Sequence, residues 1–243
     1  MTLRIEERDD RVIAALDRPD KRNAIDQDTI DALHLLCAEL EAVPRTLILT
    51  GSSGVFAAGA DIAQLRDRTA DDARTGINAM AFIRIAELPM PVIAAIDGYA
   101  LGGGAELAYA ADIRIATPSL RIGNPETGLG IMAAAGATWR LPEIVGDARA
   151  SEMLLTGRTL DADEALRWGL VSALHPAEEL LAAAHGIADR IGANDPLATR
   201  HTKRALRTPR AQHPAIELEL QAELFESPEK QRRMTAFLER TGR

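Results

Sequence analysis

The sequence predicts an α/β fold with a helical C-terminal region, and three observations lead to this prediction. Short apolar strands alternate with helical segments up to Val145, whereas helical patterns dominate from Gly146 onward. Hydrophobic residues make up 47% of the 243 residues, which is enough for a full core. Aromatic residues make up only 3%, so small aliphatic side chains must build that core.

A strand hairpin opens the chain, and the other elements of the first half follow it. Strand-like residues at 3–7 and 12–16 flank a turn formed by two aspartates. Asp26 is placed to cap a helix that runs to about Ala42. The remaining elements predicted here are a strand at 46–50, a polar stretch at 66–74 with a helix from there to about residue 88, a strand at 92–96, a helix at 104–110, and strands at 113–116 and 120–122.

Helices make up most of the second half. They are predicted at 148–155, 162–168, 177–191, 196–206, 214–225 and 229–238, with one last strand at 171–174. The final helices carry amphipathic stripes of their own, so we expect them to pack on the core or on another subunit. We place the domain boundary after residue 190, which gives a core at 1–190 and a helical region at 191–243.

Charge and cysteine content exclude several classes of protein. The net charge is −8, from 28 basic and 36 acidic residues, which argues against nucleic acid as a partner. Cys37 is the only cysteine, so an internal disulfide is impossible and nothing suggests an oxidising compartment. The apolar run at 92–116 is interrupted by Asp97, Glu106 and Asp112, which indicates a buried core and no membrane span. We expect a cytoplasmic protein.

Two glycine-bearing segments are candidates for one binding site. They are FAAGADI at 56–62 and YALGGGAELA at 99–108. Each leads from an extended segment into the start of a helix, where backbone N–H groups are free and carry partial positive charge. Two such donors aimed at one carbonyl oxygen would form an oxyanion hole. Either segment alone is better explained by close packing of a helix on a strand.

Two glutamates lie near these segments. Glu106 is one turn into the second helix among apolar neighbours, and Glu126 lies in the loop GNPETGLG at 123–130. Charged groups are rarely buried without a partner or a task. A capping or solvent-facing carboxylate would explain either glutamate taken alone.

Taken together, these segments closely resemble the crotonase (enoyl-CoA hydratase/isomerase) superfamily. The motifs are FAAGADI, GYALGGGAELAYAADIRIA, and IGNPETGLG followed by WRL, and the resemblance runs from RNAI near Arg22 to MTAFLER near the C-terminus. It implies a spiral of repeated β-β-α units over 1–190 and a trimerisation region over 191–243. It also implies an acyl-CoA thioester as partner and a homotrimer or a dimer of trimers.

The resemblance also implies site residues. Ala60 and Gly103 match the positions whose N–H groups form the oxyanion hole, and Glu106 and Glu126 match the paired glutamates of the hydratases. Lys21 matches the loop along the coenzyme A nucleotide. The full set of implied substrate-binding positions is Arg22, Ala24, Ala58, Ala60, Asp61, Ile62, Leu101, Gly102, Gly103, Pro125, Glu126, Phe237 and Arg240, the last two often reaching a neighbouring subunit's nucleotide.

The activity that the resemblance favours is enoyl-CoA hydration. Water adds across the 2,3 double bond of a 2-enoyl-CoA and gives a 3-hydroxyacyl-CoA, in fatty-acid or related acyl-CoA catabolism. Glu106 is the expected base and Glu126 the expected acid. No cofactor is expected, since coenzyme A is part of the substrate. No metal is expected either, because the five histidines lack ligand spacing.

The stretch after Gly130 departs from the hydratase pattern. A proline and several glycines are usual there, whereas this chain has Ile131-Met-Ala-Ala-Ala135-Gly. We expect a backbone N–H near Ala134 to hold the water, and Met132 and Trp139 to line a reshaped acyl pocket.

Four other interpretations compete with hydration. Within the same fold, an isomerase would move the double bond of a 3-enoyl-CoA with one glutamate, and a non-catalytic acyl-CoA-binding protein would be expected to lack the glutamates. A dinucleotide oxidoreductase is poorly supported, because the fingerprint at 128–133 lacks its third glycine. A serine hydrolase is supported even less, since 51–55 is no G-x-S-x-G elbow.

Overall fold

The computed structural model describes residues 2–242. The chain forms two compact units, Met1–Ala188 and Asp189–Arg243. Among the described residues, no helix combines the length and apolarity that crossing a membrane requires.

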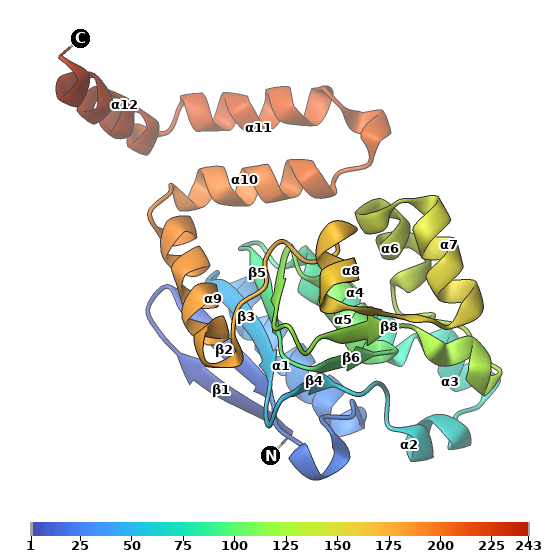
Figure 1. Ribbon diagram of the computed structural model, residues 1–243. Coiled ribbons are helices and arrows are strands. Elements are labelled where there is room, and N and C mark those ends of the chain that lie inside the picture. Colours follow the sequence, from blue (N-terminus) through green and yellow to red (C-terminus); the bar gives the residue numbers. More distant parts are fainter. Residues whose placement is uncertain (1, 243) are drawn as a thin grey trace. The chain divides into compact units, whose positions relative to one another are not determined.

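Two sheets form the framework of the first unit (Figure 1). The larger sheet has the order β1-β2-β3-β5-β7, with β1 at Leu3–Glu7, β2 at Arg11–Leu16, β3 at Thr46–Gly51, β5 at Val92–Ile96 and β7 at Ile113–Ala116. The smaller sheet has the order β4-β6-β8-β9, with β4 at Val55–Ala57, β6 at Tyr99–Leu101, β8 at Arg121–Gly123 and β9 at Thr159–Asp161. Only the β1–β2 and β8–β9 pairs of these described sheets are antiparallel.

Successive strands alternate between the two sheets. In the pairs β3/β4, β5/β6 and β7/β8, the first strand joins the larger sheet and the second joins the smaller one. The first pair is followed by α2 (Ile62–Asp67), α3 (Ala70–Thr75) and α4 (Ile77–Glu87), and the second by α5 (Gly103–Ala110). This order confirms the predicted α/β fold and its spiral of strand–strand–helix turns.

Small aliphatic side chains fill the core, as the composition predicted. β2 and β5 are buried at every residue, and α5 is buried along its whole length. The helix α1 (Gln27–Ala42) begins where predicted, because the Asp26 side chain accepts a hydrogen bond of 2.9 Å from the Thr29 amide. Burial of α5 matters for function, since it carries Glu106 into the interior.

Shorter helices complete the first unit. They are η1 (Pro19–Lys21), η2 (Pro125–Leu129), α6 (Ala137–Val145), α7 (Asp147–Thr156) and α8 (Ala162–Arg167), and α9 (Ala177–Gly192) runs across the boundary between the units. The second unit contains α10 (Pro196–Arg207), η3 (Arg210–Gln212), α11 (Ala215–Phe225) and α12 (Pro228–Thr241). Within it, His201 on α10 contacts Glu223 on α11 at 2.8 Å.

Two predictions about secondary structure are wrong. Residues 171–174 form no strand: the Ser172 amide donates to the Arg114 carbonyl and the Ala116 amide to the Ala173 carbonyl, but the segment makes a single isolated bridge, between Leu174 and Ala116, and the last described strand is β9. The polar stretch at 66–74 is largely helical, because Thr69 and Asp72 form a capping box that starts α3. The three-residue strands β4 and β6 and the helix α6 were not predicted as such.

Candidate active site

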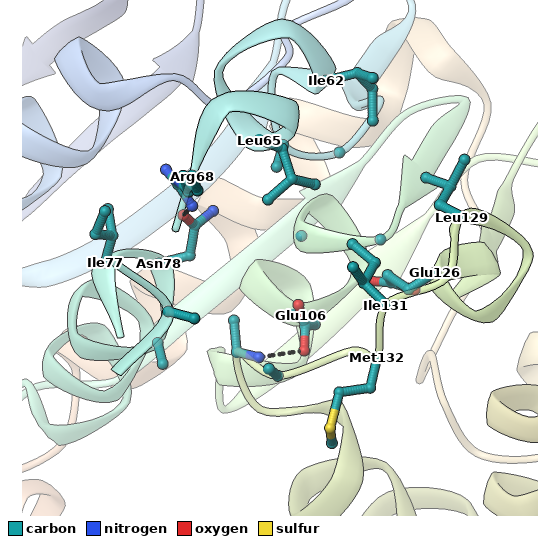
Figure 2. Close-up of a pocket in the computed structure, with 18 of the residues that line it drawn as sticks. Ile62, Leu65, Arg68, Ile77, Asn78, Glu106, Glu126, Leu129, Ile131 and Met132 are labelled. Carbon is teal, nitrogen blue, oxygen red and sulfur yellow. Dashed lines mark hydrogen bonds between the residues drawn. The ribbon is translucent and has the colours of Figure 1, made fainter. Parts of the chain in front are cut away.

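A cavity of about 500 Å³ opens in the first unit (Figure 2). Segments of α2, α3 and α4 form one part of its wall, and the start of α5, η2 and the loop before α6 form the rest. Most of the lining is apolar, including Leu65, Ile77, Leu129 and Met132. A cavity of this size and character is typical of a site that binds a small molecule.

The local geometry requires two of the three consecutive glycines, and the third lines the cavity. Gly102 has φ 51° and ψ −123°, a conformation that side chains disfavour. A methyl group on Gly104 would lie 2.3 Å from the Ala57 carbonyl oxygen, so its absence lets α5 pack directly on β4. Gly103, between them, is the first residue of α5 and lines the cavity.

The two glycine segments meet at the cavity. A methyl group on Gly103 would lie 3.5 Å from the Ala60 nitrogen, and one on Gly59 would lie 3.2 Å from the Leu101 carbonyl oxygen. Among the described residues, neither the Ala60 nor the Gly103 N–H group has a hydrogen-bond acceptor. Two free N–H donors beside the N-terminus of α5 could stabilise an oxygen that gains negative charge.

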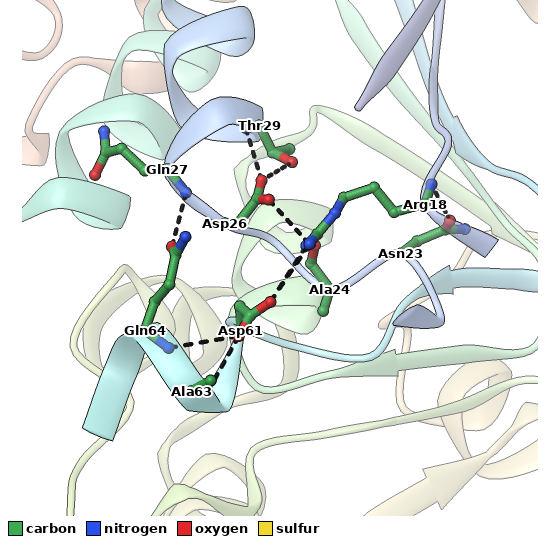
Figure 3. A network of polar contacts seen from close by, with 9 residues as sticks. All are labelled: Arg18, Asn23, Ala24, Asp26, Gln27, Thr29, Asp61, Ala63 and Gln64. Carbon is green, nitrogen blue, oxygen red and sulfur yellow. Dashed lines mark hydrogen bonds and ion pairs between the residues drawn. The ribbon is translucent and has the colours of Figure 1, made fainter. Parts of the chain in front are cut away.

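A polar network holds the segment that carries Ala60 (Figure 3). Arg18 forms ion pairs with Asp26 at 3.0 Å and Asp61 at 3.4 Å. Asp61 caps α2 by accepting a hydrogen bond of 3.1 Å from the Ala63 amide. On either side of Ala60, the Gly59 carbonyl accepts from the Ile25 amide and the Asp61 amide donates to the Ile25 carbonyl. The Ala60 N–H is therefore fixed by bonds that its neighbours make.

Glu106 is buried, with 3% of its surface exposed, and its carboxylate is held by the backbone. Oε1 accepts hydrogen bonds from the Ala135 amide at 2.7 Å and the Ala137 amide at 3.2 Å. Burial raises the pKa of Glu106 to about 7, and the charge of Glu126 acts in the same direction, although the two N–H donors oppose it. A carboxyl group with this pKa can exchange a proton at neutral pH.

Glu126 lies in η2 and is 8% exposed. Its Oε1 accepts a hydrogen bond of 3.4 Å from the Asn124 amide, whose Oδ1 accepts one of 3.1 Å from the Tyr109 hydroxyl. Its Oε2 is buried with no hydrogen-bond partner among the described residues. Burial raises the pKa of Glu126 too. Two carboxyl groups with raised pKa values therefore line one cavity.

Most of the predicted site residues come together in the cavity lining. These are Ala58, Ala60, Ile62, Leu101, Gly102, Gly103, Glu106, Pro125 and Glu126. Met132 also lines the cavity, as predicted, whereas the 42% exposed Trp139 does not. Ala134, the position near which an N–H group was expected to hold the water, also lines the cavity, and the amides of Ala135 and Ala137 beyond it hold Glu106.

Five predicted substrate-binding residues lie outside this lining. Asp61 caps α2, and Arg22 and Ala24 belong to the loop after β2, where their carbonyl oxygens accept from the Ala58 amide and from Arg18. Phe237 and Arg240 are exposed residues of α12 in the second unit.

Sequence reasoning missed several residues of the site. Tyr109 and Asn124 form the hydrogen-bond chain that ends on Glu126. Their positions in the sequence could have indicated this role, since Tyr109 lies three residues after Glu106 and Asn124 two residues before Glu126. Arg68 and Asn78 line the cavity from the stretch between FAAGADI and β5, which carries no motif.

Comparison with known proteins identifies the family. The model of the family described as "Enoyl-CoA hydratase/isomerase" matches residues 11–242, nearly the whole chain. The chain belongs to this enoyl-CoA hydratase/isomerase family. Membership implies an acyl-CoA substrate.

Relatives within the enoyl-CoA hydratase/isomerase family match this chain over nearly its full length. The chain is 38% identical to the short-chain-enoyl-CoA hydratase of Clostridium acetobutylicum over 237 residues, 94% of this chain and 91% of that protein. It is 37% identical to the crotonyl-CoA hydratase of Syntrophomonas wolfei, over 97% of this chain and 94% of that protein. The solved enoyl-CoA hydratase of Bacillus anthracis superposes with a TM-score of 0.93 at 31% identity, covering 99% of this chain and 97% of that one. This confirms the fold.

Proposed function

We propose that the chain is an enoyl-CoA hydratase, which adds water across the 2,3 double bond of a 2-enoyl-CoA to give a 3-hydroxyacyl-CoA. The observation that carries the proposal is that two buried glutamates and two free amide donors line one largely apolar cavity.

The amide pair would bind the thioester oxygen. Conjugation makes the β-carbon electrophilic, so attack by water moves negative charge onto that oxygen. The N–H groups of Ala60 and Gly103, with the N-terminus of α5 behind them, stabilise the charge as it develops. Losing one donor of this kind typically costs about 3 kcal/mol of activation free energy.

Glu106 acts as the base and Glu126 as the acid. The amides of Ala135 and Ala137 stabilise the ionised form of Glu106 through one oxygen, which leaves the other oxygen to orient and deprotonate water. Glu126 has one oxygen without a hydrogen-bond donor, which suits a protonated carboxyl that delivers its proton to the α-carbon. The roles reverse in dehydration.

The remaining parts of the proposal concern coenzyme A and assembly. Lys21, Arg22 and Ala24 would contact the coenzyme A nucleotide, and Phe237 and Arg240 would reach the nucleotide of a neighbouring subunit. The assembly would be a homotrimer or a dimer of trimers, with residues 191–243 as the trimerisation region. These assignments follow from the match of this chain's motifs to the family.

The alternative activity is isomerisation of a 3-enoyl-CoA, which needs one carboxyl group to shuttle a proton. The presence of both glutamates in the cavity favours hydration, because water addition uses a base and an acid together. A protein that only binds acyl-CoA has no use for two buried carboxyl groups.

Two substrates separate these activities. With crotonyl-CoA, the purified protein should remove the ultraviolet absorbance of the conjugated enoyl thioester without any added cofactor. With a 3-enoyl-CoA, an isomerase would instead increase that absorbance. If the absorbance increases with the 3-enoyl-CoA and does not decrease with crotonyl-CoA, the proposal is overturned in favour of isomerisation. If the absorbance changes with neither substrate, a binding protein is favoured.

A further inference from the structure

The apolar wall of the cavity contains a pair of hydrogen-bond donors. Asn78 is the second residue of α4, lines the cavity and is only 9% exposed. Arg68 follows α2, lines the same cavity, and donates a hydrogen bond of 3.0 Å from Nη1 to the Asn78 Oδ1 (Figure 2). The donated bond fixes which way the Asn78 amide faces.

The free end of the Asn78 amide lies beside the start of α5. Its Nδ2 would be 3.6 Å from a methyl group placed on Gly103, the position where the thioester would bind. Among the described residues, this nitrogen donates to no acceptor. The acyl group of a bound thioester would therefore pass an unsatisfied amide donor.

The Arg68 guanidinium is also incompletely paired. It forms no ion pair with a carboxylate of the described residues. Asp72 lines the same wall, where the Thr69 amide and hydroxyl donate hydrogen bonds of 2.7 Å to its carboxylate and lower its pKa, and the charge of Arg68 acts in the same direction. Arg68 and Asn78 thus present donors and one positive charge, which the Asp72 carboxylate offsets in part.

An alkyl chain is a poor complement to this wall. Covering Asn78 and Arg68 with methylene groups would strip water from donors without replacing its hydrogen bonds, which is unfavourable. A carbonyl, hydroxyl or carboxylate oxygen on the acyl chain would satisfy the same donors, and a carboxylate would also pair with the guanidinium.

We propose that Arg68 and Asn78 select acyl groups that carry an oxygen acceptor beyond the thioester, with a carboxylate as the strongest ligand. The proposal rests on the proposed function for the identity of the site as an acyl-CoA pocket. It extends that function by naming the class of acyl group.

Binding of saturated thioesters tests the proposal without turnover. Calorimetry would compare butyryl-CoA with succinyl-CoA, and hexanoyl-CoA with adipyl-CoA and the methyl ester of adipyl-CoA. We expect at least one carboxylated member to bind about tenfold or more tightly than the alkyl member of equal length, the scale of one hydrogen bond to a charged group. Tighter or equal binding of both alkyl members would overturn the proposal. If the methyl ester binds more tightly than hexanoyl-CoA, the hydrogen-bond donors cause the selection. If only adipyl-CoA binds more tightly than hexanoyl-CoA, the positive charge of Arg68 causes it.

Variants assign the preference to the pair. Asn78→Leu, in which the side chain keeps a similar size, and Arg68→Met should each reduce the preference about tenfold. The preference is measured as the dissociation constant of the alkyl thioester divided by that of the carboxylated thioester of equal length. Arg66→Met removes a positive charge from α2 at a side chain that is 76% exposed, and should leave the ratio within twofold. If both cavity variants keep the wild-type ratio, the proposal is overturned. An equal loss of affinity for every thioester would also overturn it, because that result would mean that Asn78 binds the thioester oxygen.

The hydration assay keeps the two proposals apart. A wild-type protein that shows the binding preference but hydrates no enoyl-CoA would contradict the proposed function and leave the inference standing. A wild-type protein that hydrates enoyl-CoA but shows no binding preference would support the proposed function and contradict the inference.

Discussion

At the scale of single residues, the two carboxyl groups carry the chemistry, and isosteric replacement tests them. Glu106→Gln and Glu126→Gln should each lower kcat by about a hundredfold or more, the usual contribution of a positioned acid or base. Steady-state hydration of crotonyl-CoA measures this. Glu143→Gln on α6 is an exposed control that should behave as wild type. Near-normal activity in both cavity variants would refute the assignment.

The pKa of Glu106 predicts how activity depends on pH. A base must be ionised to accept a proton, and burial raises the pKa of this group to about 7. The value of kcat/KM should therefore rise about tenfold or more between pH 5 and pH 7, as the ionised fraction of Glu106 rises while the acid Glu126 keeps its proton. A flat profile over this interval would show that Glu106 is not the base.

The same group predicts a dependence of stability on pH. Because the folded-state pKa of Glu106, about 7, exceeds the ordinary value of 4.5, the folded protein holds a proton that the unfolded chain releases. The free energy of unfolding should thus fall between pH 4.5 and pH 7, by up to about 3 kcal/mol from this group. Urea titrations of the wild type and Glu106→Gln, compared across this range, measure the contribution. Parallel curves for the two proteins would contradict it.

At the scale of elements, the junction between β4 and α5 sets the position of the amide donors. Gly104→Ala places a methyl group 2.7 Å from the Ala57 Cβ and closer still to its carbonyl oxygen, so α5 must move away from β4. We expect the free energy of unfolding to fall by about 1–3 kcal/mol, as in other overpacked cores.

A matched glycine controls for the loss of a glycine as such. Gly128 in η2 has no atom within 4 Å of where a Cβ would lie, so Gly128→Ala should leave stability nearly unchanged. Thermal unfolding of the two variants makes the comparison. Equal stability of Gly104→Ala and wild type would mean that the close approach of α5 to β4 is not needed.

At the scale of the whole molecule, the second unit exposes large apolar side chains. Leu206 is 80% exposed, Leu218 is 67% exposed and Phe237 is 58% exposed in the single chain. Exposed apolar surface of this kind is typical of protein–protein interfaces. We predict that sedimentation velocity gives about three or six times the chain mass of 26.1 kDa. A species of single-chain mass at micromolar concentration would contradict the proposed trimer.

Motifs and periodicity were sufficient for most of the fold. The hairpin, the capped helix after Asp26 and the strands at 46–50 and 92–96 were predicted, because each has a strong local signal. β4 and β6 have three residues each, too few for alternation to register. Residues 171–174 are apolar enough for a strand and lie along β7 at the edge of the larger sheet, but they make one bridge there and no continuous ladder.

The sequence by itself determined which chemistry is present: paired glutamates, two glycine-bearing turns and an apolar setting, since these are properties of residue types and their spacing. The tertiary structure alone decided what faces what. It brought Ala60 to Gly103, placed the Ala135 and Ala137 amides on Glu106, and set Arg68 against Asn78. These contacts join residues that are far apart in the sequence. They depend on how whole elements pack together, so no local sequence pattern predicts them.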